Sequence, residues 1–174
     1  MSSSSRAARR RVALLTSRLI ARGVQPATAV AEGAAKAGRD TSEIDLIVPV
    51  FAVPGDSPED RAKLVQRART QIAFYGSTPN YAFQFDDLGF EGTTARLGEL
   101  MKAGDLAGMG ETITDDMLEH FAVVSSWDDM ADRLRDRYAG VARRLVMYLT
   151  AEDIKRTPEN LARWGEIAQA VRAA

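Results

Sequence analysis

Apolar residues recur at the spacing of an amphipathic helix from Val12 to Arg39. Gly23 and Pro26 interrupt this pattern, because glycine weakens a helix and proline removes a backbone donor. The pattern therefore predicts two helices separated by a short break. The second should end near Gly38, which suits the residue that follows a helix.

Three short apolar runs rich in β-branched residues predict strands. They are Ile44–Val53, Phe121–Val124 and Arg144–Leu149. The first run is almost unbroken, which is typical of a strand covered on both faces. Pro49 weakens this prediction, because proline has no N–H to donate to a neighbouring strand.

Helical patterns alternate with these runs. A helix that begins at Ser57 should reach about Tyr75, and a glycine-rich stretch of short helices separates it from the second strand. Ser126 and Thr157 begin two further helices. Strands that alternate with helices pair in parallel. Three such strands leave only one interior strand, so the sequence predicts part of an α/β fold.

The composition fits one globular domain. The chain has 174 residues, of which 45% are hydrophobic and 27% charged. Without cysteine it forms no disulfides, and no apolar run is long enough to span a membrane. The apolar stretch Val12–Leu15 is too short for the core of a signal peptide. We therefore expect a cytoplasmic protein without a membrane partner.

Charged residues are unevenly distributed along the chain. Residues 1–11 contain four arginines and no acid, which leaves 19 basic and 24 acidic residues, a net charge of −5, in the remainder. We expect residues 1–11 to be a flexible basic N-terminus and residues 12–174 to form the domain. An acidic body is a poor match for nucleic acid, so an adaptor role through Arg6–Arg11 is the weakest hypothesis.

Few residues suggest chemistry by themselves. The only histidine, His120, has no second histidine for a metal pair and no evident nucleophile beside it. The adjacent carboxylates Asp86-Asp87 and Asp128-Asp129 would point in different directions on a helix. We predict no metal site, and no catalytic residue can be named.

Two hydroxyl-bearing segments are candidate binding sites. Tyr75, Ser77 and Thr78 lie in a turn between aromatic residues, where they either end a helix or line the rim of a pocket. Ser125 and Ser126 lie between a strand and a helix, where they either cap the helix or face an anion. The residues alone leave both alternatives open.

Five segments together resemble a known family. They are AKAGRD at 35–40, VPVFA at 48–52, QIAFYGSTPNY at 71–81, ITDDML at 113–118 and FAVV at 121–124. Over about residues 17–150 the chain resembles the C-terminal half of luciferase-like monooxygenases. The similarity is closest to the coenzyme F(420)-dependent oxidoreductases of actinobacteria.

The resemblance implies an eight-stranded (β/α) barrel, with the three predicted strands in sixth, seventh and eighth place. It implies hydride transfer between F(420) or flavin mononucleotide and a small organic substrate. The implied cofactor-binding residues are Tyr75, Ser77, Thr78, Ser125 and Ser126, and the implied substrate-pocket residues are Phe51 and Val53. Where the family usually has a glycine- and proline-containing turn, this chain has Ser125-Ser126-Trp127.

A non-catalytic role is the alternative. The chain could be a truncated barrel half or an interaction module, because a sheet with exposed edges and apolar surface favours association. Its partner would be an N-terminal barrel half or a second copy of itself.

Overall fold

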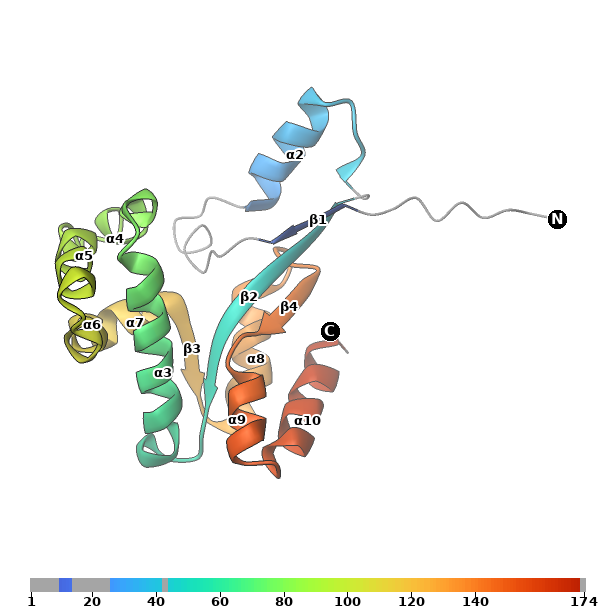
Figure 1. Ribbon diagram of the computed structural model, residues 1–174. Coiled ribbons are helices and arrows are strands. Elements are labelled where there is room, and N and C mark those ends of the chain that lie inside the picture. Colours follow the sequence, from blue (N-terminus) through green and yellow to red (C-terminus); the bar gives the residue numbers. More distant parts are fainter. Residues whose placement is uncertain (1–9, 14–25, 42–43, 173–174) are drawn as a thin grey trace.

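The computed structural model describes residues 10–13, 26–41 and 44–172. Residues 1–9 of the expected flexible N-terminus and the helical pattern through residues 14–25 lie outside the described residues. The described chain forms a parallel sheet with helices on both sides (Figure 1). This is the predicted α/β class, and it is consistent with part of a luciferase-like barrel.

The longest strand, β2, organises the sheet. It spans Ile44–Pro54 and pairs in parallel with each of the other strands. Those strands are β1 (Arg10–Ala13), β3 (Ala122–Ser125) and β4 (Arg144–Met147). The three strands predicted from sequence are therefore present, with β2 as the interior strand.

Strands β3 and β4 lie on opposite edges of β2. The Gly55 N–H donates to the Ser125 carbonyl beyond β3, whereas the Tyr148 N–H donates to the Val50 carbonyl from beyond β4. Odd and even residues of a strand direct their polar groups to opposite edges. In a barrel built in chain order, the second of three consecutive strands would lie in the middle. Here the first of the three predicted strands occupies that position.

The same alternation explains how β2 accommodates Pro49. The carbonyls of Leu46 and Val50 accept hydrogen bonds from Arg143 and Tyr148, so the even positions face β4. Pro49, at an odd position, faces the opposite edge of β2. On that edge it lies between residues 44–47, which pair with β1, and residues 51–54, which pair with β3, so its missing N–H falls in a gap between the two pairings. The proline removes no donor that the β4 pairing needs.

The helical prediction for Val12 and Ala13 is wrong, because both belong to strand β1. This strand pairs Arg10 with Ile44 and Ala13 with Ile47, and it crosses the domain boundary expected at residue 11. The four residues of β1 are too few to show an alternating strand pattern, so the sequence alone did not indicate that they pair with β2. The helix expected before Gly38 is present as α2, Pro26–Lys36.

The segment between β2 and β3 is helical, as predicted. It contains α3 (Pro58–Gly76), the short 3-10 helix η2 (Pro79–Tyr81), α4 (Phe83–Asp86), α5 (Thr93–Ala103), α6 (Leu106–Thr112) and α7 (Asp115–Phe121). Ser57 caps α3 as expected, since its hydroxyl accepts from the Asp60 N–H while the Asp60 carboxylate accepts from the Ser57 N–H.

Three helices follow β3. They are α8 (Trp127–Tyr138), α9 (Thr150–Arg156) and α10 (Asn160–Arg172). The strand expected at Arg144–Leu149 ends at Met147, because Leu149 already caps α9. The buried Asp153 carboxylate of α9 accepts hydrogen bonds from the Trp164 indole at 2.8 Å and from Asn160 at 3.0 Å. These bonds hold α9 and α10 together.

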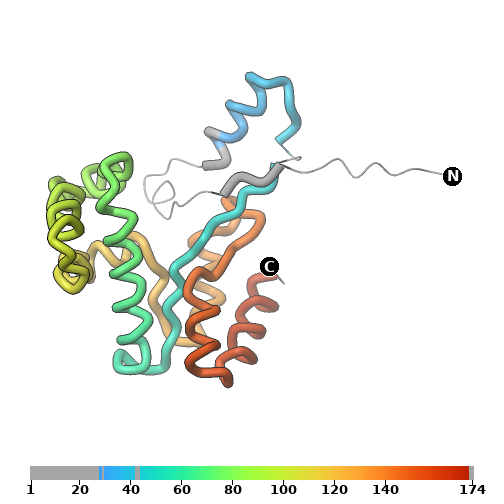
Figure 2. The backbone as a smooth tube through the Cα atoms, in the orientation of Figure 1, coloured from blue at the N-terminus to red at the C-terminus, as the bar shows by residue number. Residues whose placement is uncertain are grey.

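Two apolar clusters fill the space beside the sheet. The even-numbered residues of β2 from Leu46 to Ala52 pack with α8 and α10, around Met130 and Leu134. Val53 instead packs with α3 and the other helices of the insert, around Phe85 and Leu97. The tube view shows the two groups of helices on either side of the strands (Figure 2). Ile47, Pro49 and Phe51 are only partly buried, and Phe51 packs against the edge of the α3 cluster.

Candidate functional site

Four aromatic residues form a connected group, which we call the aromatic cluster: Phe51, Phe74, Tyr75 and Tyr148. The Phe51 and Tyr148 rings meet edge to face with centroids 5.3 Å apart, and Phe74 meets Tyr75 in the same way at 5.7 Å. The hydroxyls of Tyr75 and Tyr148 are 2.7 Å apart and share a hydrogen bond. One bond thus joins residues separated by 73 positions in the sequence.

Three elements position this cluster. Phe51 belongs to β2, and Tyr148 follows β4 directly, held by its own N–H at 2.9 Å from the Val50 carbonyl. Tyr75 lies in the last turn of α3, which crosses back along the sheet after its start beside Pro54. The cluster therefore depends on the β2–β4 pairing and on the length of α3.

The cluster lies on a partly open surface. Phe51 is half-buried, whereas Tyr148 is 40% exposed and the neighbouring strand residue Val146 is 45% exposed. On β4, Leu145 and Met147 pack into the cluster of α8 and α10, so Val146 and Tyr148 point to the other face. We call this surface the open face: Ile47, Pro49, Phe51, Val146 and Tyr148.

The Tyr75 phenol remains neutral at physiological pH. The hydrogen bond with Tyr148, followed by burial, raises the pKa of Tyr75 to about 12. A neutral phenol both donates and accepts, and one proton of the pair remains available beyond the shared bond. The cluster therefore offers flat aromatic surface together with one hydroxyl proton for a ligand.

The predicted cofactor residues fall into two separate places. Ser77 and Thr78 follow α3 beside Tyr75, whereas Ser125 pairs with Pro54 just before α3 begins. A helix of 19 residues extends about 28 Å. The structure thus keeps Tyr75, Ser77 and Thr78 at one end of α3, where Tyr75 reaches Phe51 through Tyr148, and it places Ser125 and Ser126 near the other end.

Most of the predicted hydroxyls already have partners. Ser77 Oγ donates to the Phe74 carbonyl at 2.8 Å, while Thr78 is exposed and makes no side-chain cap. Ser126 Oγ accepts from the Asp129 N–H at 3.1 Å and donates to the Asp129 carboxylate at 2.8 Å. Ser125 Oγ donates to the Ser126 carbonyl at 2.9 Å.

The start of α8 is a poor place for an anion. Ser126 caps this helix, and Asp128 and Asp129 in its first turn already place negative charge at its positive end. Of the two sequence interpretations for Ser125-Ser126, the geometry favours the helix cap. Val53, a predicted pocket residue, is completely buried in the core beside α3 and does not reach the open face.

Sequence reasoning did not single out Tyr148. A signal was present, because Tyr148 is the next-to-last residue of the third apolar run, close to the end at which binding residues follow parallel strands. What the pattern could not show was the direct pairing of β4 with β2. This pairing places Tyr148 against Phe51.

His120 and the acidic pairs form no metal site. His120 Nε2 lies 3.9 Å from the Asp116 carboxylate and its ring faces Phe90. Within the described ranges, no three histidine, cysteine or acidic side chains are grouped so that they could hold a metal ion.

Comparison with known proteins identifies the family. Residues 11–144 match the luciferase-like monooxygenase family, a stretch that includes all but the first residue of β1, together with β2, the helical insert and β3. The chain belongs to the luciferase-like monooxygenase family. The match supports an oxidoreductase-type domain, and this family commonly binds flavin or F(420).

Relatives of this luciferase-like chain occur in mycobacteria. An uncharacterized protein of Mycobacterium bovis is 37% identical over 118 residues, which cover 68% of this chain and 35% of that protein. Uncharacterized proteins from two strains of Mycobacterium tuberculosis match to the same extent. The chain thus spans about a third of the length of these curated relatives.

Among the helices of the described residues, none combines the length and apolarity needed to cross a membrane.

Proposed function

We propose that this chain forms part of a luciferase-like oxidoreductase that transfers hydride between a small organic substrate and F(420) or flavin mononucleotide. The observation that carries the proposal is the aromatic cluster on the open face, where Tyr75 and Tyr148 share a hydrogen bond beside Phe51. When bound, the cofactor would supply the hydride chemistry. The residues of the chain would supply a surface that orients it.

The cluster fits one side of a planar heterocycle. Phe51 and Tyr148 offer ring surface, and the paired hydroxyls offer a neutral donor for a carbonyl or ring nitrogen. A tight site also needs a concave wall and several converging polar groups. Ser77 already donates to the Phe74 carbonyl and Ser126 caps α8. The residues present therefore fit part of a cofactor site, and we derive no catalytic step from them.

The proposal is tested by restoring the missing wall. The chain is mixed with the N-terminal half of a related barrel, and F(420) and flavin mononucleotide are titrated by fluorescence. We expect saturable binding only in the mixture. Tyr148→Phe, and Ser77→Ala combined with Thr78→Ala, should then weaken it by about three- to tenfold, as for lost hydrogen bonds. Tyr81→Phe serves as a control, since Tyr81 lies outside the cluster. Unchanged binding in both site variants would contradict the proposal.

A second candidate function rests on the open face as an interaction surface. Val146 and Tyr148 are large exposed residues beside the half-buried Ile47, Pro49 and Phe51. Such surfaces promote association. We infer that a non-catalytic barrel half would pair here with an N-terminal half or with a second copy of this chain.

Sedimentation velocity tests this second candidate. The wild-type chain should associate at micromolar concentration, and Val146→Lys should shift it toward monomer because the lysine must stay hydrated. Leu161→Lys, on an exposed residue of α10, is the matched control and should leave association unchanged. A compact monomer at all concentrations would exclude self-pairing through this face.

A further inference from the structure

A large groove lies beside β4, and three residues of this strand, Arg144, Leu145 and Met147, line it. It has a volume of about 980 Å³ and is bounded by α8, β4 and the C-terminal part of α10. Leu145 and Met147 of β4 form part of its floor, together with Val171 of α10. None of the four residues of the aromatic cluster lines this groove, so the two places are separate.

Four arginines and no acidic residue line this groove, which we call the arginine groove. They are Arg135, Arg143, Arg144 and Arg172. Arg135 pairs with Asp132 and donates to the Ala170 carbonyl at 3.0 Å. Arg143 lies 3.5 Å from the Asp45 carboxylate. These contacts pair two of the four guanidinium groups with carboxylates.

The other two arginines add uncompensated charge. Arg144 begins β4 and Arg172 ends α10, and both side chains are exposed at the edge of the groove. Neither forms an ion pair with an acidic residue among the residues that the structure describes. The groove therefore carries an excess of positive charge although the whole chain has a net charge of −1.

A buried hydroxyl also lacks a partner in the groove wall. Tyr138 lines the groove, is only 3% exposed, and its hydroxyl makes no hydrogen bond within the described part of the chain. Burial raises the pKa of this phenol, so it keeps its proton at physiological pH. Buried hydroxyls are normally bonded, and an unbonded one marks a place where an acceptor is missing.

Size and charge together define the occupant. The volume matches that of sites for small organic ligands, and the floor is apolar. Inorganic phosphate would leave the floor uncovered, and a neutral hydrocarbon would leave the arginines unused. We propose that the arginine groove binds a small amphiphilic anion, whose apolar chain covers Leu145, Met147 and Val171 and whose carboxylate or phosphate meets Arg144 and Arg172.

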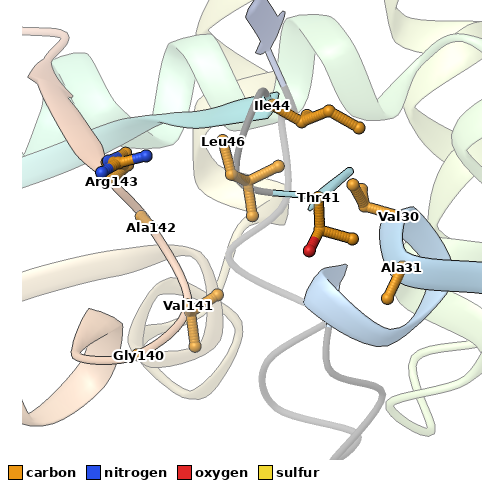
Figure 3. A pocket seen from close by; sticks show the side chains of 9 residues that line it. All are labelled: Val30, Ala31, Thr41, Ile44, Leu46, Gly140, Val141, Ala142 and Arg143. Carbon is orange, nitrogen blue, oxygen red and sulfur yellow. The ribbon is translucent and has the colours of Figure 1, made fainter. Parts of the chain in front are cut away.

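A neighbouring cavity adjoins the same arginine. This cavity of about 430 Å³ lies between α2, the start of β2 and the α8–β4 turn, and Arg143 lines it as well (Figure 3). Its other lining residues include the apolar Val30, Leu46 and Val141. The amphiphile is assigned to the arginine groove because only that groove has Arg144 and Arg172.

Calorimetric titration of the full chain tests the proposal with three ten-carbon probes below their micellar concentrations. Decanoate and decyl phosphate carry the charge, and decanol lacks it. We expect both anions to bind, and decanol to bind at least about tenfold more weakly. The tighter of the two anions identifies the preferred headgroup. Acetate and inorganic phosphate, which have no chain, should not bind measurably.

Two variants locate the site. Arg144→Ala combined with Arg172→Ala should weaken decanoate binding about tenfold, as for two partly exposed ion pairs. Arg133→Ala is the matched control, because Arg133 is an exposed arginine of α8 that does not line the groove. Ala168→Trp, on an exposed residue at the groove edge, should fill the groove and abolish binding without altering the buried core.

The proposal is overturned if neither anion binds at millimolar concentration, or if decanol binds as well as decanoate. It is also overturned if the double arginine variant and Arg133→Ala lose affinity equally. Thermal unfolding of each variant distinguishes loss of the site from loss of the fold. None of these results depends on cofactor binding at the aromatic cluster, so the two proposals can fail separately.

Discussion

The two faces of β2 differ in almost every respect. The even-numbered residues from Leu46 to Ala52 are between 1% and 7% exposed, and α8 and α10 cover them. The odd-numbered residues from Ile47 to Phe51 are only half-buried, and Val146 and Tyr148 extend this uncovered surface. One strand thus forms both a core layer and an open face.

The difference separates the residues that maintain the fold from those available for binding. The covered face is uniformly aliphatic, so its contribution is burial. The open face combines aromatic rings with a hydroxyl pair, which burial alone does not explain. Changes on the two faces should therefore have unequal effects on stability.

Valine-to-alanine substitutions on the two faces should show the largest contrast. Val48→Ala, at a residue 1% exposed, should reduce the free energy of unfolding by about 2–3 kcal/mol through lost burial and a new cavity. Val146→Ala, at a residue 45% exposed, should cost less than about 0.5 kcal/mol. Urea unfolding of both variants measures the contrast. Equal losses would mean that the open face is covered in solution.

A glycine pair tests how α3 positions Tyr75. A Cβ at Gly76 would lie 2.6 Å from the Phe85 ring, so Gly76→Ala should destabilise the protein by about 1–3 kcal/mol. Gly98→Ala is the control, because a Cβ at Gly98 would lie 3.8 Å from the Ser77 carbonyl, an ordinary contact, and alanine favours a helix. That variant should gain about 0.5–1 kcal/mol. Thermal unfolding that showed a gain for Gly76→Ala would refute the close packing at this helix end.

The two groups of predicted hydroxyls should differ by a smaller amount. Ser126→Ala removes the cap of α8 and should cost about 1 kcal/mol. Thr78→Ala removes an exposed hydroxyl without a capping bond and should change stability by less than about 0.5 kcal/mol. Chemical denaturation distinguishes the two. A neutral Ser126→Ala would reopen the anion-site interpretation for Ser126.

The smallest expected effect concerns the titration of the Tyr75 phenol. Because the pKa of Tyr75 is raised to about 12, the stabilisation from its neutral form is complete below pH 10 and is lost as pH rises through 12. Tyr148→Phe removes the principal cause, so the pKa of Tyr75 should fall toward 10.0. Tyr81→Phe removes only the weakest cause and should change the pKa much less. Ultraviolet absorbance of phenolate monitors both variants. An unchanged titration in Tyr148→Phe would contradict the shared hydrogen bond.

Local pattern was sufficient for most of the elements. The apolar run at Ile44–Val53 and the cap at Ser57 predicted β2 and α3 almost to the residue. Strand β1 was missed because its four residues become a strand only through pairing with β2. The order of the strands was equally inaccessible, since no pattern in the sequence states which strand lies in the middle.

The candidate site was predictable only in part. Phe51 came from the resemblance and Tyr75 also from the hydroxyl-bearing turn, and Tyr148 connects the two, whereas Ser125 pairs with Pro54 near the opposite end of α3 from Tyr75. Tyr148 required knowledge that β4 pairs with β2. Contacts between residues distant in sequence, rather than local propensity, decide which of the candidates meet.

The central claim is that the aromatic cluster is one wall of an incomplete cofactor site. The most direct test is a fluorescence titration of the chain alone with F(420) and with flavin mononucleotide. A wall without an enclosing pocket lacks most of the burial and converging hydrogen bonds of a tight site. We therefore expect no saturable binding below about 100 µM. Low-micromolar binding to the chain alone, weakened by Tyr148→Phe, would contradict the account by showing that the site is already complete.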